Sequence, residues 1–329
     1  MKTERLQANK IGVARAAELL RAGGTVAFPT ETVYGLGANA FDAAAVAQIF
    51  AAKERPAWDP LIVHVSDREM LERVTAIGDE ERVQVDRLIG AFWPGPLTLL
   101  LPRTAEVPDA VTAGRALVGV RMPAHELARA LIRQAGVPIA APSANRFGHT
   151  SPTTMAHVLA DLDGRIDAVL DGGPTTVGVE STVFDVAARS IYRPGAVTAA
   201  MISSMVGGEV RVVGAAADGA ASPGMGMRHY APRARLVLVS GQAEMLAEIR
   251  KYPGAEVGVM LPDGWDAGAA ASVFRWGPWE AAEVLARLLF FGLRMLDAGG
   301  VKVIVCPVPE MDGLGEALRD RLAKAARTL

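Results

Sequence analysis

The sequence predicts an α/β protein built from two domains. The chain has 329 residues, which is long for one hydrophobic core and about right for two. Half of the residues are hydrophobic, which is enough to pack cores of that size. Segments with helical and strand patterns alternate along most of the chain, and the alternation stops between residues 196 and 233. We therefore expect a larger N-terminal domain and a smaller C-terminal domain joined by that stretch.

The N-terminal domain is predicted to hold a twisted mixed sheet with helices. Amphipathic or apolar periodicity predicts helices over 11–23, 42–54, 125–136 and 155–162. Short apolar runs predict strands over 25–30, 61–65, 96–102, 117–123, 138–144, 168–173, 181–186 and 190–195. Because the last three strands are closely spaced, we expect antiparallel as well as parallel pairs.

The C-terminal domain is predicted to be a small Rossmann-like α/β unit. A short helix near 201–206 and a strand near 209–213 precede a stretch rich in Ala, Gly and Pro. Strands are then expected over 234–241, 256–261 and 301–308, with helices over 242–252, 278–300 and 314–327. The predicted division is a domain over 1–197, a linker over 198–233 and a domain over 234–329.

Charge and composition exclude several classes of protein. The formal net charge is −2 at pH 7, so no general basic field indicates a nucleic-acid binder. Cys306 is the only cysteine and lies in an apolar run, so no disulfide forms within the chain and a buried thiol is expected. No stretch approaches the roughly 20 apolar residues of a membrane span, and the N-terminus lacks the apolar region of a signal peptide. We therefore expect a cytoplasmic protein that does not bind membranes.

Several site motifs are matched only in part or are missing. Residues 35–40 match GxGxxA, but PTET separates these glycines from the preceding strand and no acidic residue follows at the expected distance. His125 and Glu126 begin an HExxH pattern, whose second histidine is replaced by Arg129. The sequence contains no Walker loop and no GxSxG elbow, and its histidines lack metal-ligand spacing. We expect neither a Rossmann dinucleotide site nor a metal held by the protein.

Four segments combine turn-forming residues with polar side chains: 28–37, 53–64, 142–152, and 178–183 with 192–195. In the first segment, we interpret the glycines as a turn that lets a ligand approach the backbone. In the second, Lys53 and Arg55 end a helix beside a proline-stiffened loop. This arrangement suits an anion such as a polyphosphate, although cations there also complement the helix dipole. The third segment follows the carboxyl end of a strand, where open α/β sheets bind ligands.

The stretch SPGMGMRHYAP at 222–232 is interpreted as both a joint and part of a site. Its Pro and Gly residues are typical of turns, and the Ala- and Gly-rich run before it already supplies a flexible spacer. A spacer has no need of Arg228, His229 and Tyr230.

Together and in this order, the motifs resemble those of one family. They are PTETVYGLG, KxRPxxxPLIVH, WPGPLT, VGVRMP, PSAN, ESTV and RPGA, and they span about residues 11–197. This set is similar to the threonylcarbamoyl-adenylate synthases, the YrdC-like proteins. The tail, with SPGM and HYAP, resembles the long two-domain form of that family. In that form the segment lies over the nucleotide pocket, so the resemblance implies that the stretch 222–232 acts as a lid.

The resemblance implies an activity and partners. Members of the family condense L-threonine, bicarbonate and ATP into threonylcarbamoyl-AMP and release pyrophosphate, a nucleotidyl transfer that needs no covalent nucleophile. The product serves the threonylcarbamoyl-adenosine modification of tRNA, so a transient handover to the downstream transferase machinery is implied, without stable nucleic-acid binding. Mg²⁺ is expected on the ATP phosphates, held largely by the substrate.

The resemblance also implies roles for individual residues. Lys53 and Arg55 would face the phosphates as catalytic residues. Position 59 is Asp where related sequences commonly carry Asn or His, and a carboxylate beside a triphosphate is repulsive unless Mg²⁺ or Arg55 intervenes. The implied ATP contacts are Arg55, Asp59, Ser143, Asn145, Ser151, Arg193 and Tyr230. The implied threonine pocket comprises Thr32, His64, Arg121, the Ala141 backbone and Ser181, with Arg121 as the fork for the carboxylate.

Two alternative functions stay open at this point. One is a carbamoyl transferase that acts on another acceptor, although such proteins usually carry additional catalytic domains. The other is a non-catalytic RNA-binding module, which the near-neutral charge and the absence of aromatic RNA-stacking motifs disfavour.

Overall fold

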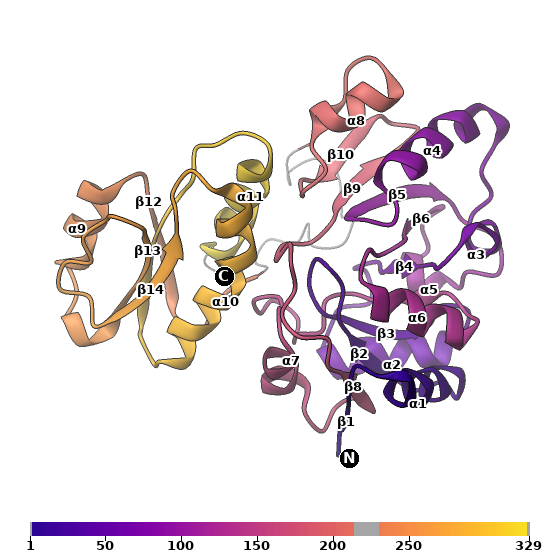
Figure 1. The fold of residues 1–329 in the computed structure, drawn as a ribbon, viewed down its shortest axis with the longest axis horizontal. Coiled ribbons are helices and arrows are strands. Elements are labelled where there is room, and N and C mark those ends of the chain that lie inside the picture. The colour runs from indigo at the N-terminus through magenta and orange to yellow at the C-terminus, as the bar shows by residue number, and fades with distance from the viewer. Residues whose placement is uncertain (1, 214–229, 328–329) are drawn as a thin grey trace. The chain divides into compact units, whose positions relative to one another are not determined.

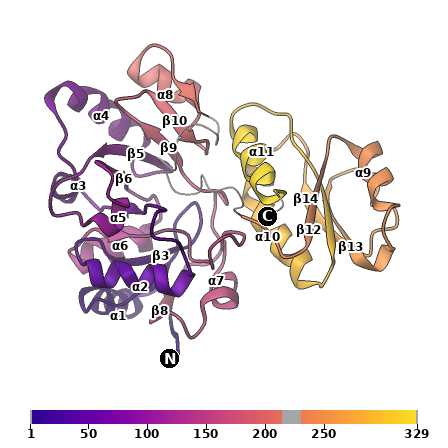
Figure 2. The same ribbon diagram turned by 180° about the vertical axis from the view of Figure 1, so that it is seen from behind.

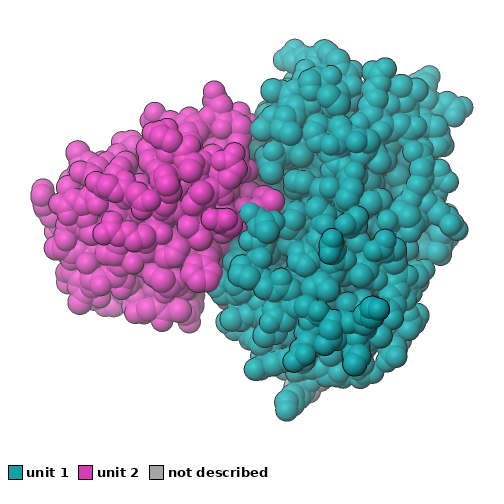
Figure 3. Space-filling model, in the orientation of Figure 1, with its two compact units in different colours: residues 1–147, 152–176, 180–226 teal, residues 148–151, 177–179, 227–329 magenta. Residues whose placement is uncertain are grey.

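The computed structural model describes residues 2–213 and 230–327. The chain divides into two compact units, coloured separately in Figure 3. Unit 1 comprises residues 1–147, 152–176 and 180–226, and unit 2 comprises 148–151, 177–179 and 227–329. Two short segments of the N-terminal half therefore belong to the same compact unit as the C-terminal half. The boundaries expected at residues 197 and 233 stay predictions.

Unit 1 is built on an eleven-stranded mixed sheet, as predicted (Figures 1 and 2). The strand order is β1-β8-β2-β3-β7-β4-β6-β5-β9-β10-β11, with parallel pairs such as β4 with β6 and antiparallel pairs such as β5 with β6. The strands are β1 (Glu4–Leu6), β2 (Val26–Phe28), β3 (Gly35–Asn39), β4 (Ile62–His64), β5 (Leu97–Pro102), β6 (Leu117–Arg121), β7 (Ile139–Ala140), β8 (Ala168–Leu170), β9 (Thr182–Asp185), β10 (Ser190–Arg193) and β11 (Arg211–Val212).

Most helices of unit 1 begin at a side-chain cap that the sequence supplies. The side chains of Asn9, Asp42, Asp67, Thr154 and Thr198 each accept a hydrogen bond from a backbone N–H in the first turn, which satisfies a donor the helix leaves open. The helices are α1 (Lys10–Arg21), α2 (Ala43–Lys53), α3 (Arg68–Val74), α4 (Asp79–Phe92), α5 (Asp109–Thr112), α6 (Glu126–Ala135), α7 (Met155–Leu162) and α8 (Ala199–Val206).

The core of unit 1 lies between the sheet and these helices. Strands β2 and β8 are buried at every position, which explains their uninterrupted apolar sequences, and β4 is buried throughout although it ends at His64. Helix α1 packs on β1, β2, β3 and β8 and against α6, while α3 lies on β6. Because β4 pairs with both β6 and β7, the sheet fixes the ends of these three strands relative to one another.

The glycines at 35–37 form a strand and not the predicted turn. They belong to β3, which pairs antiparallel with β2 and β7. A Cβ atom on Gly37 would come within 2.6 Å of the Ile139 side chain and 2.7 Å of the Phe28 ring. Gly37 is therefore explained by close packing inside the sheet, where a side chain would not fit.

Unit 2 is a four-stranded parallel sheet with helices, as predicted. The order β12-β15-β13-β14 joins β12 (Arg235–Val239), β15 (Val303–Pro307), β13 (Val257–Pro262) and β14 (Ser272–Gly277). The helices are α9 (Gln242–Ile249), the 3₁₀ turn η1 (Gly254–Glu256), α10 (Ala282–Ala298) and α11 (Leu314–Ala325). Cys306 is a buried free thiol whose pKa is raised by burial, in line with its predicted packing role. Within the described residues, no helix is long and apolar enough to cross a membrane.

Candidate functional site

Arg121 is the centre of a buried polar cluster at the end of β6. Its Nη1 donates to Thr32 Oγ1 at 2.9 Å, and its Nη2 lies 2.9 Å from Glu31 Oε2. The side chains of Arg121 and Glu31 are 4% and 8% exposed, so both charges are nearly desolvated. Arg121 Nε and Glu31 Oε1 are buried and have no hydrogen-bond partner among the described residues. The cluster therefore retains a donor and an acceptor for a small zwitterion.

The loop that carries Thr32 is held by its own hydroxyl groups. Thr30 Oγ1 donates to the backbone carbonyl of Val33 at 2.6 Å and lies 2.8 Å from Thr32 Oγ1. The backbone N–H of Ala124 donates to Glu31 Oε2 at 3.0 Å, which ties the loop to the segment after β6. The orientation of Thr32 toward Arg121 is thus set by contacts from both sides.

His64 lies beside Arg121 in the sheet, because β4 and β6 pair in parallel with these two residues in register. It is 4% exposed, and its ring stands edge-on to the Phe28 ring. Burial, together with the nearby Arg121 guanidinium, lowers the pKa of His64 to about 3. The imidazole is therefore neutral at physiological pH.

The loop after β7 places Ala141, Ser143 and Asn145 against the strands of the first segment. The backbone N–H of Ala141 donates to the Ile62 carbonyl of β4 at 2.8 Å. The backbone N–H of Ala144 donates to the Tyr34 carbonyl of the first segment, also at 2.8 Å. Ser143 also forms an isolated bridge with Gly35. The predicted ATP residues Ser143 and Asn145 therefore neighbour the predicted threonine residue Ala141.

Lys53 is a buried cation that holds the loop after β7. It is 1% exposed, and its Nζ donates to the backbone carbonyls of Ser143 at 2.6 Å and Asn145 at 2.5 Å. These contacts fix the loop and add a buried positive charge next to it. The predicted role of Lys53 and Arg55 toward a polyphosphate stays a prediction.

Arg55 and Asp59 form a buried ion pair in the loop between α2 and β4. Arg55 Nη2 lies 2.9 Å from Asp59 Oδ2 and also donates to the Pro60 carbonyl at 2.8 Å. Burial raises the pKa of Asp59, although Arg55, Lys53 and Arg193 each act to lower it. Asp59 Oδ1 is buried and has no hydrogen-bond donor among the described residues. The carboxylate that the sequence flagged is thus partly neutralised by Arg55.

Arg193 on β10 joins the remaining predicted residues of unit 1. Its Nε donates to the Ser181 carbonyl and its Nη2 to Ser181 Oγ, each at 3.0 Å. Ser181 Oγ in turn lies 2.8 Å from Thr98 Oγ1 on β5. Arg193 also acts to lower the pKa of Asp59, against the larger effect of burial.

Ser151 and Tyr230 belong to unit 2, whereas the other predicted site residues belong to unit 1. Ser151 is fully buried, and Tyr230 is 1% exposed. Most of the stretch 222–232, including Arg228 and His229, lies outside the described residues, so its predicted role as a lid stays a prediction. Tyr230, Ala231 and Pro232 are described.

Two polar residues of the site were not among the predicted ones. Glu31 pairs with Arg121, and Thr98 contacts Ser181. Both lie inside motifs that the sequence analysis quoted, PTETVYGLG and WPGPLT. The available signal was a charged or hydroxyl side chain within an otherwise apolar or turn-forming motif. Between residues 2–213 and 230–327, no group of three or more His, Cys, Asp or Glu side chains is arranged to hold a metal.

Comparison with known proteins covers both halves of the chain. A family model described as "Telomere recombination", for Sua5, YciO and YrdC, matches residues 18–195. A second, described as "Threonylcarbamoyl-AMP synthase, C-terminal domain", matches residues 197–327. The chain belongs to the threonylcarbamoyl-AMP synthase family. Its long two-domain form is the one that the motifs of the sequence resemble.

Relatives in this family match over nearly their whole length. The threonylcarbamoyl-AMP synthases of Pyrococcus abyssi and Bacillus subtilis are each 44% identical, over 98% of this chain and 96% and 95% of their own. The crystal structure of P. abyssi Sua5 complexed with L-threonine is 42% identical, with a TM-score of 0.90, and covers 99% of this chain and 98% of that one. The two-domain threonylcarbamoyl-AMP synthase fold thus extends over the described parts of the chain.

Proposed function

We propose that this chain is a threonylcarbamoyl-AMP synthase, which converts L-threonine, bicarbonate and ATP to threonylcarbamoyl-AMP and pyrophosphate. The observation that carries the proposal is the 44% identity to synthases of that name over 98% of the chain. The buried cations of unit 1, Lys53, Arg55, Arg121 and Arg193, support it, because every substrate carries a carboxylate, bicarbonate or phosphate group.

Arg121 is proposed to hold the threonine carboxylate. Its Nε has no acceptor among the described residues, and its guanidinium is already oriented by Thr32 and Glu31. Glu31 Oε1 is an acceptor suited to an ammonium or hydroxyl group. Neutral His64, the Ala141 backbone and Ser181 are proposed to complete the pocket. Because His64 stays neutral, its imidazole adds no positive charge to the pocket.

The Arg55, Ser143, Asn145, Ser151, Arg193 and Tyr230 groups are proposed to contact ATP, with Lys53 and Arg55 as the catalytic cations. The threonine amine adds to the carbon of bicarbonate, and loss of water leaves a carbamate. A carbamate oxygen then attacks the α-phosphorus, and the bond from that phosphorus to the β-phosphate oxygen breaks. Buried cations stabilise the charge that develops on the departing pyrophosphate. This step is a nucleotidyl transfer.

ATP is proposed to enter as its Mg²⁺ complex. Mg²⁺ commonly binds through substrate phosphates with one or two carboxylates. Asp59 fits such a contact, because its Oδ1 is a buried acceptor without a donor among the described residues. The mixed anhydride product is labile, and we propose that it is passed to the transferase machinery that modifies tRNA.

Pyrophosphate release from ATP tests this proposal. Threonine and bicarbonate are each omitted in turn, and Arg55→Ala serves as the inactive control. We expect release to require both omitted substrates and to collapse in the variant. Release that ignores threonine would point to a carbamoyl transferase with another acceptor. Tight tRNA binding without ATP turnover would favour an RNA-binding module.

A further inference from the structure

One face of helix α10 contacts every segment of unit 2 that carries a predicted ATP residue. Residues 286, 290, 294 and 297 recur every three to four positions, so their side chains lie on one side of the helix. Helix α11 packs beside α10 (Figures 1 and 2). The contacts of this face are described below from one end of α10 to the other.

Near the start of α10, the helix backbone lies against the segment 177–179. A Cβ atom on Gly178 would come within 2.4 Å of the Arg287 Cα and 2.5 Å of the Ala286 carbonyl oxygen. Gly178 also has φ +83°, which L side chains rarely adopt. Only glycine therefore allows this segment, which leads directly to Glu180 and Ser181, to lie on α10.

In the middle of α10, Phe290 packs on Tyr230. The ring centroids are 5.7 Å apart, and the Arg321 guanidinium of α11 lies 5.2 Å from the Tyr230 ring centroid. Phe290 and Arg321 are fully buried. Tyr230 has φ +64°, a left-handed conformation that is uncommon and strained for a tyrosine. The two side chains hold a ring whose backbone alone would favour another conformation.

One turn further along α10, Arg294 binds the segment 148–151. Its guanidinium donates to the backbone carbonyls of Thr150 and Ser151. The same segment pairs with the residue after Tyr230, because the Ala231 N–H donates to the Gly148 carbonyl at 2.8 Å. The segments of Ser151 and Tyr230 are therefore joined to each other and to one helix.

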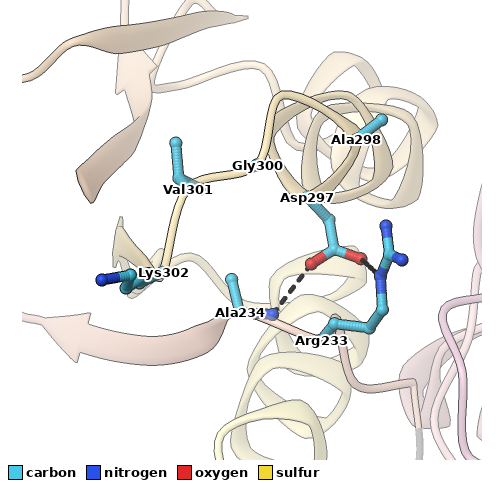
Figure 4. A pocket seen from close by; sticks show the side chains of 7 residues that line it. All are labelled: Arg233, Ala234, Asp297, Ala298, Gly300, Val301 and Lys302. Carbon is cyan, nitrogen blue, oxygen red and sulfur yellow. Dashed lines mark hydrogen bonds and ion pairs between the residues drawn. The ribbon is translucent and has the colours of Figure 1, made fainter. Parts of the chain in front are cut away.

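At the end of α10, Asp297 fixes the chain just after Tyr230. Its carboxylate accepts from the Ala234 N–H at 2.8 Å and from Arg233 Nε at 3.1 Å, beside an open pocket of about 430 Å³ (Figure 4). The residues that follow Tyr230 are thus anchored to the same helix as its ring.

We propose that Phe290, Arg294 and Arg321 are positioning residues that hold Tyr230 and Ser151 for ATP. The inference rests on the proposed function, and it gives the C-terminal half of the chain an indirect part in nucleotide binding. The three side chains act through their neighbours, so their loss reduces ATP affinity. Thr32 and Arg121 belong to unit 1, and the contacts described for them above all lie within that unit.

The test measures the KM for ATP and for threonine in Arg294→Ala, Arg294→Lys and Phe290→Leu, together with ATP affinity by calorimetry without threonine. Loss of charged hydrogen bonds predicts a roughly ten- to hundredfold weaker ATP interaction in Arg294→Ala. Partial recovery is expected in Arg294→Lys, which keeps the charge but not the fork. The KM for threonine is expected to stay within about twofold of wild type.

Arg319→Ala is the matched control. Arg319 on α11 also donates to two backbone carbonyls of unit 2, those of Pro309 and Met311, away from Tyr230 and Ser151. We expect its ATP affinity to equal that of wild type. Unchanged ATP affinity in Arg294→Ala and Phe290→Leu, or equal rises of both KM values, would overturn the inference.

Two readouts keep this inference separate from the proposed function. If the wild type releases no threonine-dependent pyrophosphate, the proposed function fails, while calorimetry still reports whether Arg294 and Phe290 govern ATP binding. If Arg294→Ala does not fold, Phe290→Leu and Arg294→Lys carry the same comparison. A wild type that turns over normally beside unaltered variants contradicts the inference alone.

Discussion

Arg193 donates to both the backbone carbonyl and the hydroxyl of Ser181, each at 3.0 Å. One guanidinium that we propose to contact ATP therefore also sets the orientation of a residue proposed to contact threonine. Both residues are buried, so the geometry of this fork is not shared with water. This contact predicts that a change at Arg193 weakens the binding of both ATP and threonine.

Replacing Arg193 with Lys tests this coupling. A single ammonium does not reproduce the two parallel bonds of the fork. We expect the KM values for ATP and threonine both to rise, by about tenfold or more. Steady-state kinetics with each substrate varied in turn measures the effect. Arg189→Lys, in the turn before β10, is the control, and a change in only one KM of Arg193→Lys would contradict the coupling.

Removing the charge of Arg121 is expected to weaken the binding of threonine and to leave the binding of ATP unchanged. Arg121→Gln leaves Glu31 buried without its partner, which costs about 3–5 kcal/mol and obscures the kinetics. The double variant Arg121→Gln with Glu31→Gln removes both charges and is expected to recover much of that stability. We predict that it still binds threonine at least about tenfold more weakly. Calorimetric titration with threonine that matches wild type would remove Arg121 from the pocket.

The buried imidazole of His64 makes stability depend on pH. Its pKa is about 3 in the folded protein and near 6.5 when unfolded, so the unfolded chain binds more protons between these values. The contribution of His64 is fully present above about pH 6.5 and is lost as pH falls, with a limiting slope of about 1.4 kcal/mol per pH unit. Denaturant unfolding from pH 7.5 to 4.5 should show a shallower loss in His64→Gln. Parallel curves for the two proteins would exclude this account.

Lys53 is expected to be a stability residue as well as a functional one. Lys53→Met removes the donor to two buried carbonyls, those of Ser143 and Asn145, at a cost of about 2–4 kcal/mol in the free energy of unfolding. The loosened loop should also raise the KM for ATP. Lys251→Met, at an exposed pair with Glu248, is the control and should change stability by less than about 0.5 kcal/mol. Equal stability of the two variants would contradict this role of Lys53.

The sequence predicted the parts of the fold that have strong local signals. The predicted helices over 11–23 and 42–54 and the strand over 61–65 have clear apolar patterns and capping or turn residues. Helix α4 was not predicted, because only Val85 and Leu88 of its fourteen residues are buried and its cap makes no side-chain hydrogen bond. Strand β14 and the glycine strand β3 depend on tertiary pairing, which local patterns do not contain.

The candidate site was predictable as a set of residues but not as a set of contacts. Glu31 and Arg121 are separated by three strands in the chain, so their ion pair follows only from the sheet topology. The burial of Lys53 beneath the loop of Ser143 and Asn145 likewise arises from packing and not from local sequence. The contacts of Tyr230 with Phe290 and Arg321 required the fold of unit 2.

Transfer of carbon from labelled bicarbonate tests the proposed reaction most directly. The enzyme is incubated with ATP, threonine and ¹³C-bicarbonate, and the nucleotide products are separated and weighed by mass spectrometry. The proposed function predicts a product with the mass of AMP joined through one labelled carbonyl group to the amine of threonine, formed together with pyrophosphate. A nucleotide product without the label, or a labelled one formed without threonine, would contradict the account.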